Sequence, residues 1–160
     1  MEIYGYKCFN KDMTNRYGKK LEIGKIYSTS NDVKFGNDGT GYHFCKNMED
    51  TFRYFPATTE EVSVCYVKGS GNIVEYEDDY NGYYDMYAAE SIEILKKLDR
   101  QEVINYALEL PSYRVKRFIQ TFKLNDDEIE LFKDKFKNNL DVINTISYYQ
   151  LNDLDVYKRK

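Results

Sequence analysis

The first two-thirds of the chain alternates hydrophobic and polar residues with a period of two, which is typical of β-strands. The alternating segments cover residues 3–9, 21–27, 61–67, 72–76 and 92–95, and the last is favoured over a helix that residues 86–98 also fit. Gly24 lies inside the second segment and predicts a bulge there. Gly69-Ser70-Gly71 predicts a turn that pairs the third segment with the fourth as a hairpin. The pattern therefore predicts a small, mostly antiparallel sheet.

A short aromatic strand and a short helix are expected inside this region. Three glycines within residues 36–41 predict a tight loop, because glycine tolerates positive φ. Tyr42-His43-Phe44-Cys45 then predicts a buried strand. Asn47 is a suitable N-cap for a helix that ends before Pro56.

From Asp99 onward the hydrophobic residues recur every three or four positions, which predicts amphipathic helices. Pro111 ends the first of these stripes, and the second runs from Val115 to Phe122. Asn125 is a suitable cap for the third, because three acidic residues follow it. A fourth stripe starts at Leu140.

The change of period predicts the domain organisation. We expect an α+β fold, with a sheet domain over residues 1–98 and a helical segment over residues 99–160. The helical segment holds three or four short helices, which form a small bundle or cover the sheet.

Composition restricts the compartment and the metal chemistry. Hydrophobic residues make up 42% of the 160 residues, enough for a core, and no apolar run approaches the roughly 20 residues that span a bilayer. The N-terminus has no basic segment and no apolar signal core, so we expect a cytoplasmic protein. Three widely spaced cysteines predict buried thiols, with neither a disulfide framework nor a metal site.

Charge is unevenly distributed along the chain. The net charge is −4, yet Glu75 to Glu93 carries seven acidic residues and no basic one, so the remainder sums to +3. A basic stripe typical of nucleic-acid binding is missing from this window, and a basic protein surface is the expected partner. The predicted contact residues are Glu75, Tyr76, Glu77, Asp78, Asp79, Tyr80, Tyr83, Tyr84, Asp85 and Tyr87. Tyrosine suits such a surface, because it supplies large contact area at low entropic cost.

Three segments of the N-terminal half resemble a family of uncharacterised domains common in phage and prophage genes. They are residues 4–13, 24–27 and 41–45, and the resemblance covers roughly the first 75 residues. It implies a mobile-element origin. We therefore expect a phage-type inhibitor that blocks a basic, nucleic-acid-handling surface of a host factor, such as a CRISPR effector.

A second resemblance is to the ADP-ribosyltransferases. Gly39-Thr40-Gly41-Tyr42-His43-Phe44 is similar to their glycine turn and aromatic strand, which implies a degenerate core of that fold. His43 would replace the tyrosine that stacks on nicotinamide. The residue that grips NAD on the first strand would fall near Tyr6 or Lys7.

The resemblance also bears on catalysis. The catalytic glutamate of the family would fall at Tyr83, and a phenol that is neutral at pH 7 cannot supply that charge. Glu90 or Glu93 takes the role only if the register differs. The enzymatic alternative is therefore an NAD-dependent ADP-ribosyltransferase that uses His43, Tyr6 and Glu90.

The leading expectation is a binding protein without catalytic residues or cofactor. A phage structural or assembly module is a further alternative. Neither the identity of the partner nor the oligomeric state follows from the sequence.

Overall fold

The computed structural model describes residues 1–30, 32–34, 40–52, 62–76 and 86–152. These residues form two compact units, and the boundary lies between Asp99 and Arg100. Strands make up the first unit and helices the second, so the predicted α+β class is confirmed.

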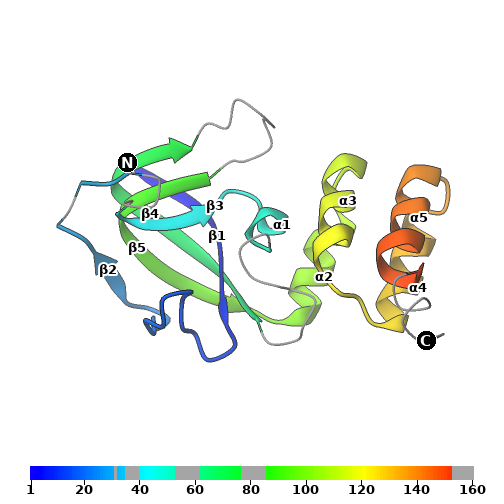
Figure 1. Ribbon diagram of the computed structural model, residues 1–160, viewed down its shortest axis with the longest axis horizontal. Helices are drawn as coiled ribbons and strands as arrows, with labels where there is room; N and C mark the ends of the chain where they lie inside the picture. Colours follow the sequence, from blue (N-terminus) through cyan, green and yellow to red (C-terminus); the bar gives the residue numbers. More distant parts are fainter. Residues whose placement is uncertain (31, 35–39, 53–61, 77–85, 153–160) are drawn as a thin grey trace. The chain divides into compact units, whose positions relative to one another are not determined.

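The first unit is a five-stranded antiparallel sheet with a short helix, α1 (Met48–Thr51). Its strands are β1 (Glu2–Asn10), β2 (Ile26–Ser28), β3 (Tyr42–Cys45), β4 (Val62–Tyr76) and β5 (Met86–Leu98). The order is β2-β5-β3-β1-β4, and β4 also pairs with β5. The strands β1, β3, β5 and β4 therefore form a closed ring (Figure 1).

Phe44 fills the centre of this ring. Its side chain is 2% exposed, and its ring centroid lies 5.4 Å from that of Tyr87. A Cβ placed on Gly69 would lie 2.6 Å from the Phe44 ring, and a Cβ on Gly5 would lie 2.3 Å from the Cys45 carbonyl oxygen. Both glycines are therefore required by the close approach of β3.

The hairpin predicted at Gly69-Ser70-Gly71 is wrong, because β4 runs through these residues without turning. Gly71 has φ of +79°, and the pairing with β5 shifts register between Ser70 and Ile73. One extra residue on β4 forms a bulge there. Glycines that resemble a turn in the sequence serve a close contact and a bulge in the structure.

The second predicted strand, 21–27, is also wrong in its bounds. Leu21 is 1% exposed and belongs to the core, and β2 begins at Ile26. Gly24 has φ of +86° and donates its backbone N–H to the Ile94 carbonyl at 2.8 Å. A left-handed turn therefore precedes β2 in place of a bulge inside it.

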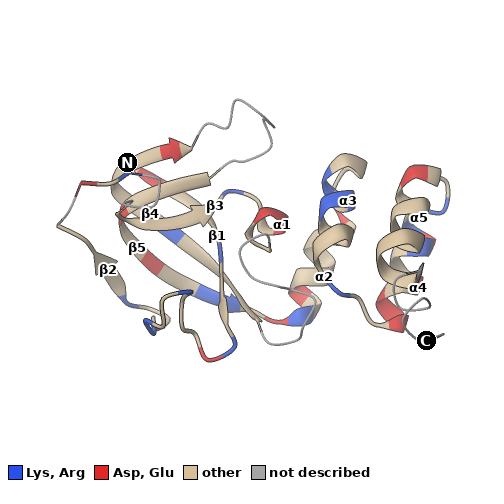
Figure 2. Ribbon diagram, in the orientation of Figure 1, with Lys and Arg blue, Asp and Glu red and all other residues tan. Residues whose placement is uncertain are grey.

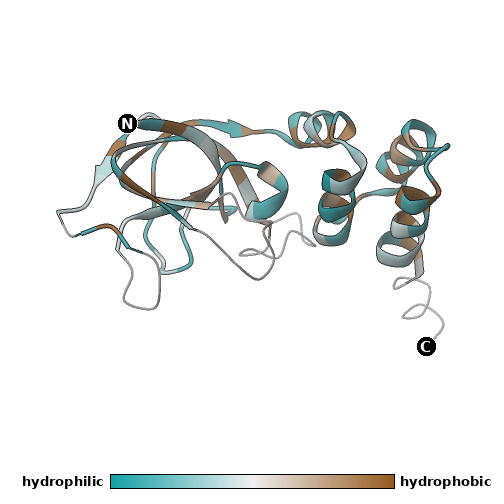
Figure 3. Cartoon of the chain, turned by 90° about the horizontal axis from the view of Figure 1, so that it is seen from above, coloured by the Kyte–Doolittle hydropathy of each residue, from teal (hydrophilic) through white to brown (hydrophobic). Residues whose placement is uncertain are grey.

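The second unit holds the C-terminal helices. They are α2 (Arg100–Leu108), α3 (Ser112–Thr121), α4 (Asp126–Lys135) and α5 (Leu140–Ile146), followed by a π-helical turn, Ser147–Asn152. Figure 3 shows hydrophobic and hydrophilic positions alternating along these helices, as the periodicity predicts. The predicted stripe of α3 is confirmed, since Val115, Phe118 and Ile119 are fully buried.

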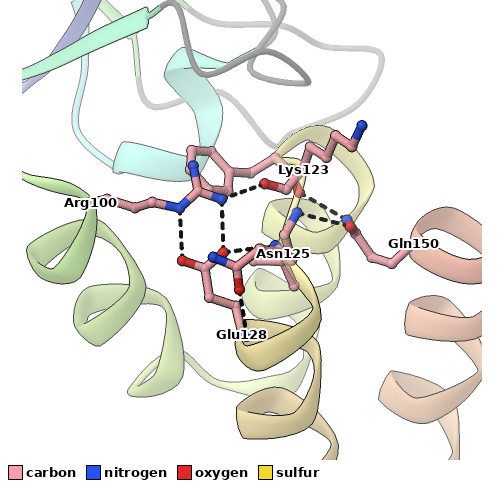
Figure 4. Close-up of polar contacts among 7 residues, drawn as sticks. Arg100, Lys123, Asn125, Glu128 and Gln150 are labelled. Carbon is pink, nitrogen blue, oxygen red and sulfur yellow. Dashed lines mark hydrogen bonds and ion pairs between the residues drawn. The ribbon is translucent and has the colours of Figure 1, made fainter.

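The start of α4 confirms the predicted cap. The Asn125 side chain accepts the Glu128 backbone N–H at 2.9 Å, and the Glu128 carboxylate accepts the Asn125 N–H at 2.9 Å. The first turn of α4 is acidic and is drawn in red in Figure 2. Arg100 donates two hydrogen bonds of 2.7 Å to Glu128 (Figure 4), which ties α2 to α4.

Gln150 anchors the π-helical turn. Its amide is 4% exposed, donates to the carbonyls of Ile119 and Phe122 at 2.7 and 2.8 Å, and accepts the Leu124 N–H at 3.0 Å. Figure 4 shows it reaching across to the link between α3 and α4. These bonds satisfy backbone groups that the end of α3 leaves without an intrahelical partner.

Within the described ranges, the helices are too short or too polar to cross a membrane.

Gly69→Ala tests the closure of the ring. We expect the free energy of unfolding to fall by roughly 1–3 kcal/mol, because the methyl group overlaps the Phe44 ring. Chemical denaturation measures this loss, and Ser70→Ala is the neighbouring control. Phe44→Leu removes the overlapping atoms, so the double variant should lose less than the sum of the two single losses. Strict additivity would contradict the proposed contact.

Candidate ligand pocket

A pocket of about 190 Å³ lies in the sheet unit, between β1, the loop that follows it, and β3. Its walls combine cationic, aromatic and thiol side chains. The lining residues are Tyr6, Lys7, Cys8, Asn15, Arg16, Tyr17, Leu21, Gly41, Tyr42, His43, Phe44, Cys45, Thr51 and Met86.

The two strands part beside this pocket. Among the described residues, Tyr6 and Cys45 are the pair that joins β1 to β3. Beyond this pair, the Lys7 ammonium donates a hydrogen bond of 2.5 Å to the His43 carbonyl. A side chain therefore bridges the strands where the backbone ladder does not.

Lys7 is a partly buried residue on the inward face of β1. Alternation places it on the same face as Gly5 and Phe9, and Phe9 is fully buried. Burial lowers the pKa of Lys7 from 10.5 to about 8. The nearby Arg16 lowers the pKa further, whereas the thiols of Cys45 and Cys8 raise it. No carboxylate of the described residues forms an ion pair with Lys7 or lines the pocket.

An ordered loop presents Arg16 to the pocket. The Asn15 side-chain oxygen accepts the backbone N–H groups of Tyr17 and Lys19 at 2.9 and 3.0 Å. Thr14 pairs with Lys20 across the loop, so the loop is closed by its own hydrogen bonds. Arg16 itself is exposed, and its guanidinium lies 5.9 Å from the Tyr17 ring centroid.

His43 lines the same pocket as a weak base. Burial lowers its pKa, the charges of Lys7 and Arg16 lower it further, and a backbone hydrogen bond with Lys34 opposes them. The imidazole is therefore neutral at pH 7. The positive charge of the pocket at pH 7 comes from Arg16 and from the protonated form of Lys7.

The three cysteines are free and buried, as predicted. Burial raises the pKa of Cys8 and of Cys65 to about 12, so both are protonated thiols at neutral pH and weak nucleophiles. His43 and Cys45, the nearest approach to a ligand pair, gain no third partner: in the described part of the chain, no three His, Cys, Asp or Glu side chains gather for a metal ion.

The structure brings together two of the three residues proposed for the transferase. Tyr6 and His43 both line the pocket, and Glu90 does not. The Glu90 carboxylate accepts the backbone N–H of Asn72 at 3.2 Å, beside the bulge at Gly71. Glu90 therefore stabilises the bulge of β4.

The predicted acidic surface lies largely outside the described residues, which leave out Glu77, Asp78, Asp79, Tyr80, Tyr83, Tyr84 and Asp85. At its edge, Glu75 is exposed and Tyr76 is 37% exposed. The prediction is wrong for Tyr87, which is 8% exposed. Its ring packs on Phe44 because the pleat of β5 directs it into the core.

Sequence reasoning did not identify Asn15, Arg16 and Tyr17 as site residues. They belong to a polar stretch that resembles any solvated loop. The alternation of β1 did indicate an unusual residue, because it places Lys7 on the same inward face as Ile3, Gly5 and Phe9. A lysine at a core position needs a reason, since burying its charge costs free energy.

The pocket lies within the part of the chain that matches a known protein family. Residues 3–106 match the domain of unknown function DUF7666. The chain belongs to the DUF7666 family. Every residue that lines the pocket falls inside the DUF7666 domain. Neither a curated protein nor a solved structure matches the chain.

Lys7→Met should raise the free energy of unfolding at pH 7 by roughly 1–3 kcal/mol, because it removes a partly buried ammonium whose charge is disfavoured by desolvation. The folded pKa is below the unfolded one, so wild-type stability should rise relative to the variant between about pH 8 and 10.5. Denaturation at both ends of this window measures the difference. Lys68→Met, which removes ion pairs with Glu2 and Glu93, should bring no gain. Equal stability loss in both variants would refute the cost assigned to Lys7.

Proposed function

We propose that the DUF7666 domain binds a small anionic ligand of the nucleotide type in the pocket between β1 and β3. The observation that carries the proposal is the joint presence of Lys7 and Arg16 in a pocket wall without a carboxylate. An anion would relieve the mutual repulsion of these two cations and supply the counter-charge that the described protein groups do not.

The neutral groups of the wall support a ligand that carries a ring. Tyr6, Tyr17 and Tyr42 offer aromatic faces, and the Asn15 amide offers hydrogen bonds. His43 and Tyr6 are also the residues that the ADP-ribosyltransferase resemblance assigns to nicotinamide and NAD. This coincidence supports a nucleotide over a simple inorganic anion.

The size of the pocket restricts the ligand further. Its volume of about 190 Å³ is below the roughly 300–1,000 Å³ of typical drug-sized ligand sites. One phosphorylated half of a dinucleotide suits it better than a whole NAD molecule. Without a carboxylate in the described wall, the proposal is binding, and ADP-ribosyl transfer by Glu90 is not part of it.

Titration calorimetry with pyrophosphate, AMP, ADP-ribose and NAD at low salt tests this function. We expect measurable affinity for the phosphorylated ligands, and a loss of about tenfold for Arg16→Gln, since a charge-assisted hydrogen bond contributes roughly 1.5–3 kcal/mol. Affinity should also fall as pH rises through about 8, where Lys7 loses its proton. Lys25→Gln, an exposed cation outside the pocket, is the matched control. Absence of heat with all four ligands would refute the proposal.

A second candidate function is docking to a basic protein surface through the acidic segment after β4. The exposure of Glu75 and Tyr76 favours it, because both lie at the end of β4, next to this segment in the sequence. The N-terminal resemblance to phage and prophage domains supports a host factor, such as a CRISPR effector, as the partner.

Reversal of Asp78, Asp79 and Asp85 to lysine tests the docking function. Repulsion from a basic partner should abolish capture of the proteins that the wild-type chain retains from a bacterial lysate. The matched control reverses three exposed carboxylates elsewhere: Glu22, Glu109 and Glu130. Quantitative mass spectrometry compares the retained proteins. Identical retention by the test variant, with an unchanged melting temperature, would rule out this surface.

A further inference from the structure

We propose that Lys7 is a reactive amine that captures small anionic carbonyl compounds, such as 2-oxo acids or aldehyde phosphates, as an imine. The inference rests on the anion-binding function proposed above and adds covalent chemistry to the same pocket. Lys7 supplies the nucleophile, and Arg16 holds the anionic group of the ligand.

The position of Lys7 is the first argument. It lies on the core face of β1, between Gly5 and Phe9, and it also lines the pocket. Its Nζ is 5.7 Å from the Phe9 ring centroid. Desolvation beside another cation is the arrangement that makes a lysine nucleophilic, because it favours the neutral amine.

The hydrogen-bond environment is the second argument. Nζ donates a hydrogen bond to the His43 carbonyl, which accepts one hydrogen and does not compete for the nitrogen lone pair. An ion pair would hold the amine as ammonium, and no carboxylate of the described residues forms one with Lys7. Burial accordingly lowers the pKa of Lys7 to about 8, so a substantial fraction is neutral near physiological pH.

The reaction balances without an oxidant or reductant. Lys7 Nζ gives up one proton to solvent, and its lone pair adds to the carbonyl carbon while the carbonyl oxygen takes up a proton. The carbinolamine then loses the second amine proton and the hydroxyl group as water, which leaves a C=N bond. His43 is a neutral imidazole in the same pocket and can accept or return a proton during this loss.

The anionic group provides selectivity. A carboxylate or phosphate beside the carbonyl would pair with the Arg16 guanidinium, which the described residues leave without a carboxylate in the pocket. A volume of about 190 Å³ admits a compound of a few carbon atoms. A neutral aldehyde of the same size would lack this contact.

Trapping with cyanoborohydride tests the proposal on the full chain. Glyoxylate carries a carboxylate and acetaldehyde does not, so the two probes separate amine reactivity from anion recognition. Peptide mapping by mass spectrometry locates the reduced adduct. We expect Lys7 to be labelled about tenfold faster by glyoxylate than the exposed Lys25, and Arg16→Gln to remove the preference for glyoxylate over acetaldehyde.

The outcomes separate this inference from the binding function. Adduct at Lys7 that pyrophosphate suppresses supports both. Pyrophosphate binding by calorimetry without enrichment of adduct at Lys7 overturns the imine proposal and leaves anion binding standing. Adduct at Lys7 that neither pyrophosphate nor Arg16→Gln alters supports a reactive amine and removes the anionic site. Lys7→Met, which should fold at least as stably as the wild type, shows the background at other lysines.

Discussion

The contact of Phe44 with two glycines is the constraint on which the sheet unit depends. β3 has four residues, and it completes the ring of strands through a single described residue pair with β1. Such a short strand is not held by its backbone ladder alone. All four of its residues pair with β5, and toward β1 and β4 its phenyl ring enters the space that Gly5 and Gly69 leave empty. Dispersion and burial at this one position add to the few hydrogen bonds that join β3 to β1.

The limited pairing between β3 and β1 also produces the pocket. Because β3 meets β1 at one residue pair, the strands part immediately beside it, and the gap opens onto the core face of β1. A hydrophobic side chain at residue 7 would fill this gap and add stability. The chain has a lysine there, and its lowered pKa indicates that this position disfavours the charge. A residue that lowers stability but lines a pocket is typical of binding or catalytic sites.

The sequence predicted what is local and missed what is brought together by folding. The cap at Asn125 was predictable because its partner, Glu128, is three residues away. The stripe of α3 was predictable from its spacing. Gly69 and Gly71 were misread because the reason for each lies on another strand, at Phe44 and at the β5 pairing. The pocket joins Lys7 to Arg16 and His43 across two strands and a loop, and no periodicity connects these positions.

Glu90 has a consequence for comparing members of the family. The ADP-ribosyltransferase resemblance gives it a catalytic role in a shifted register, yet its carboxylate accepts the Asn72 N–H at a site that the extra residue of the bulge creates. Chains that lack the insertion have no free amide for an acid to satisfy. Covariation of this acid with the length of the strand would therefore identify it as an architectural residue.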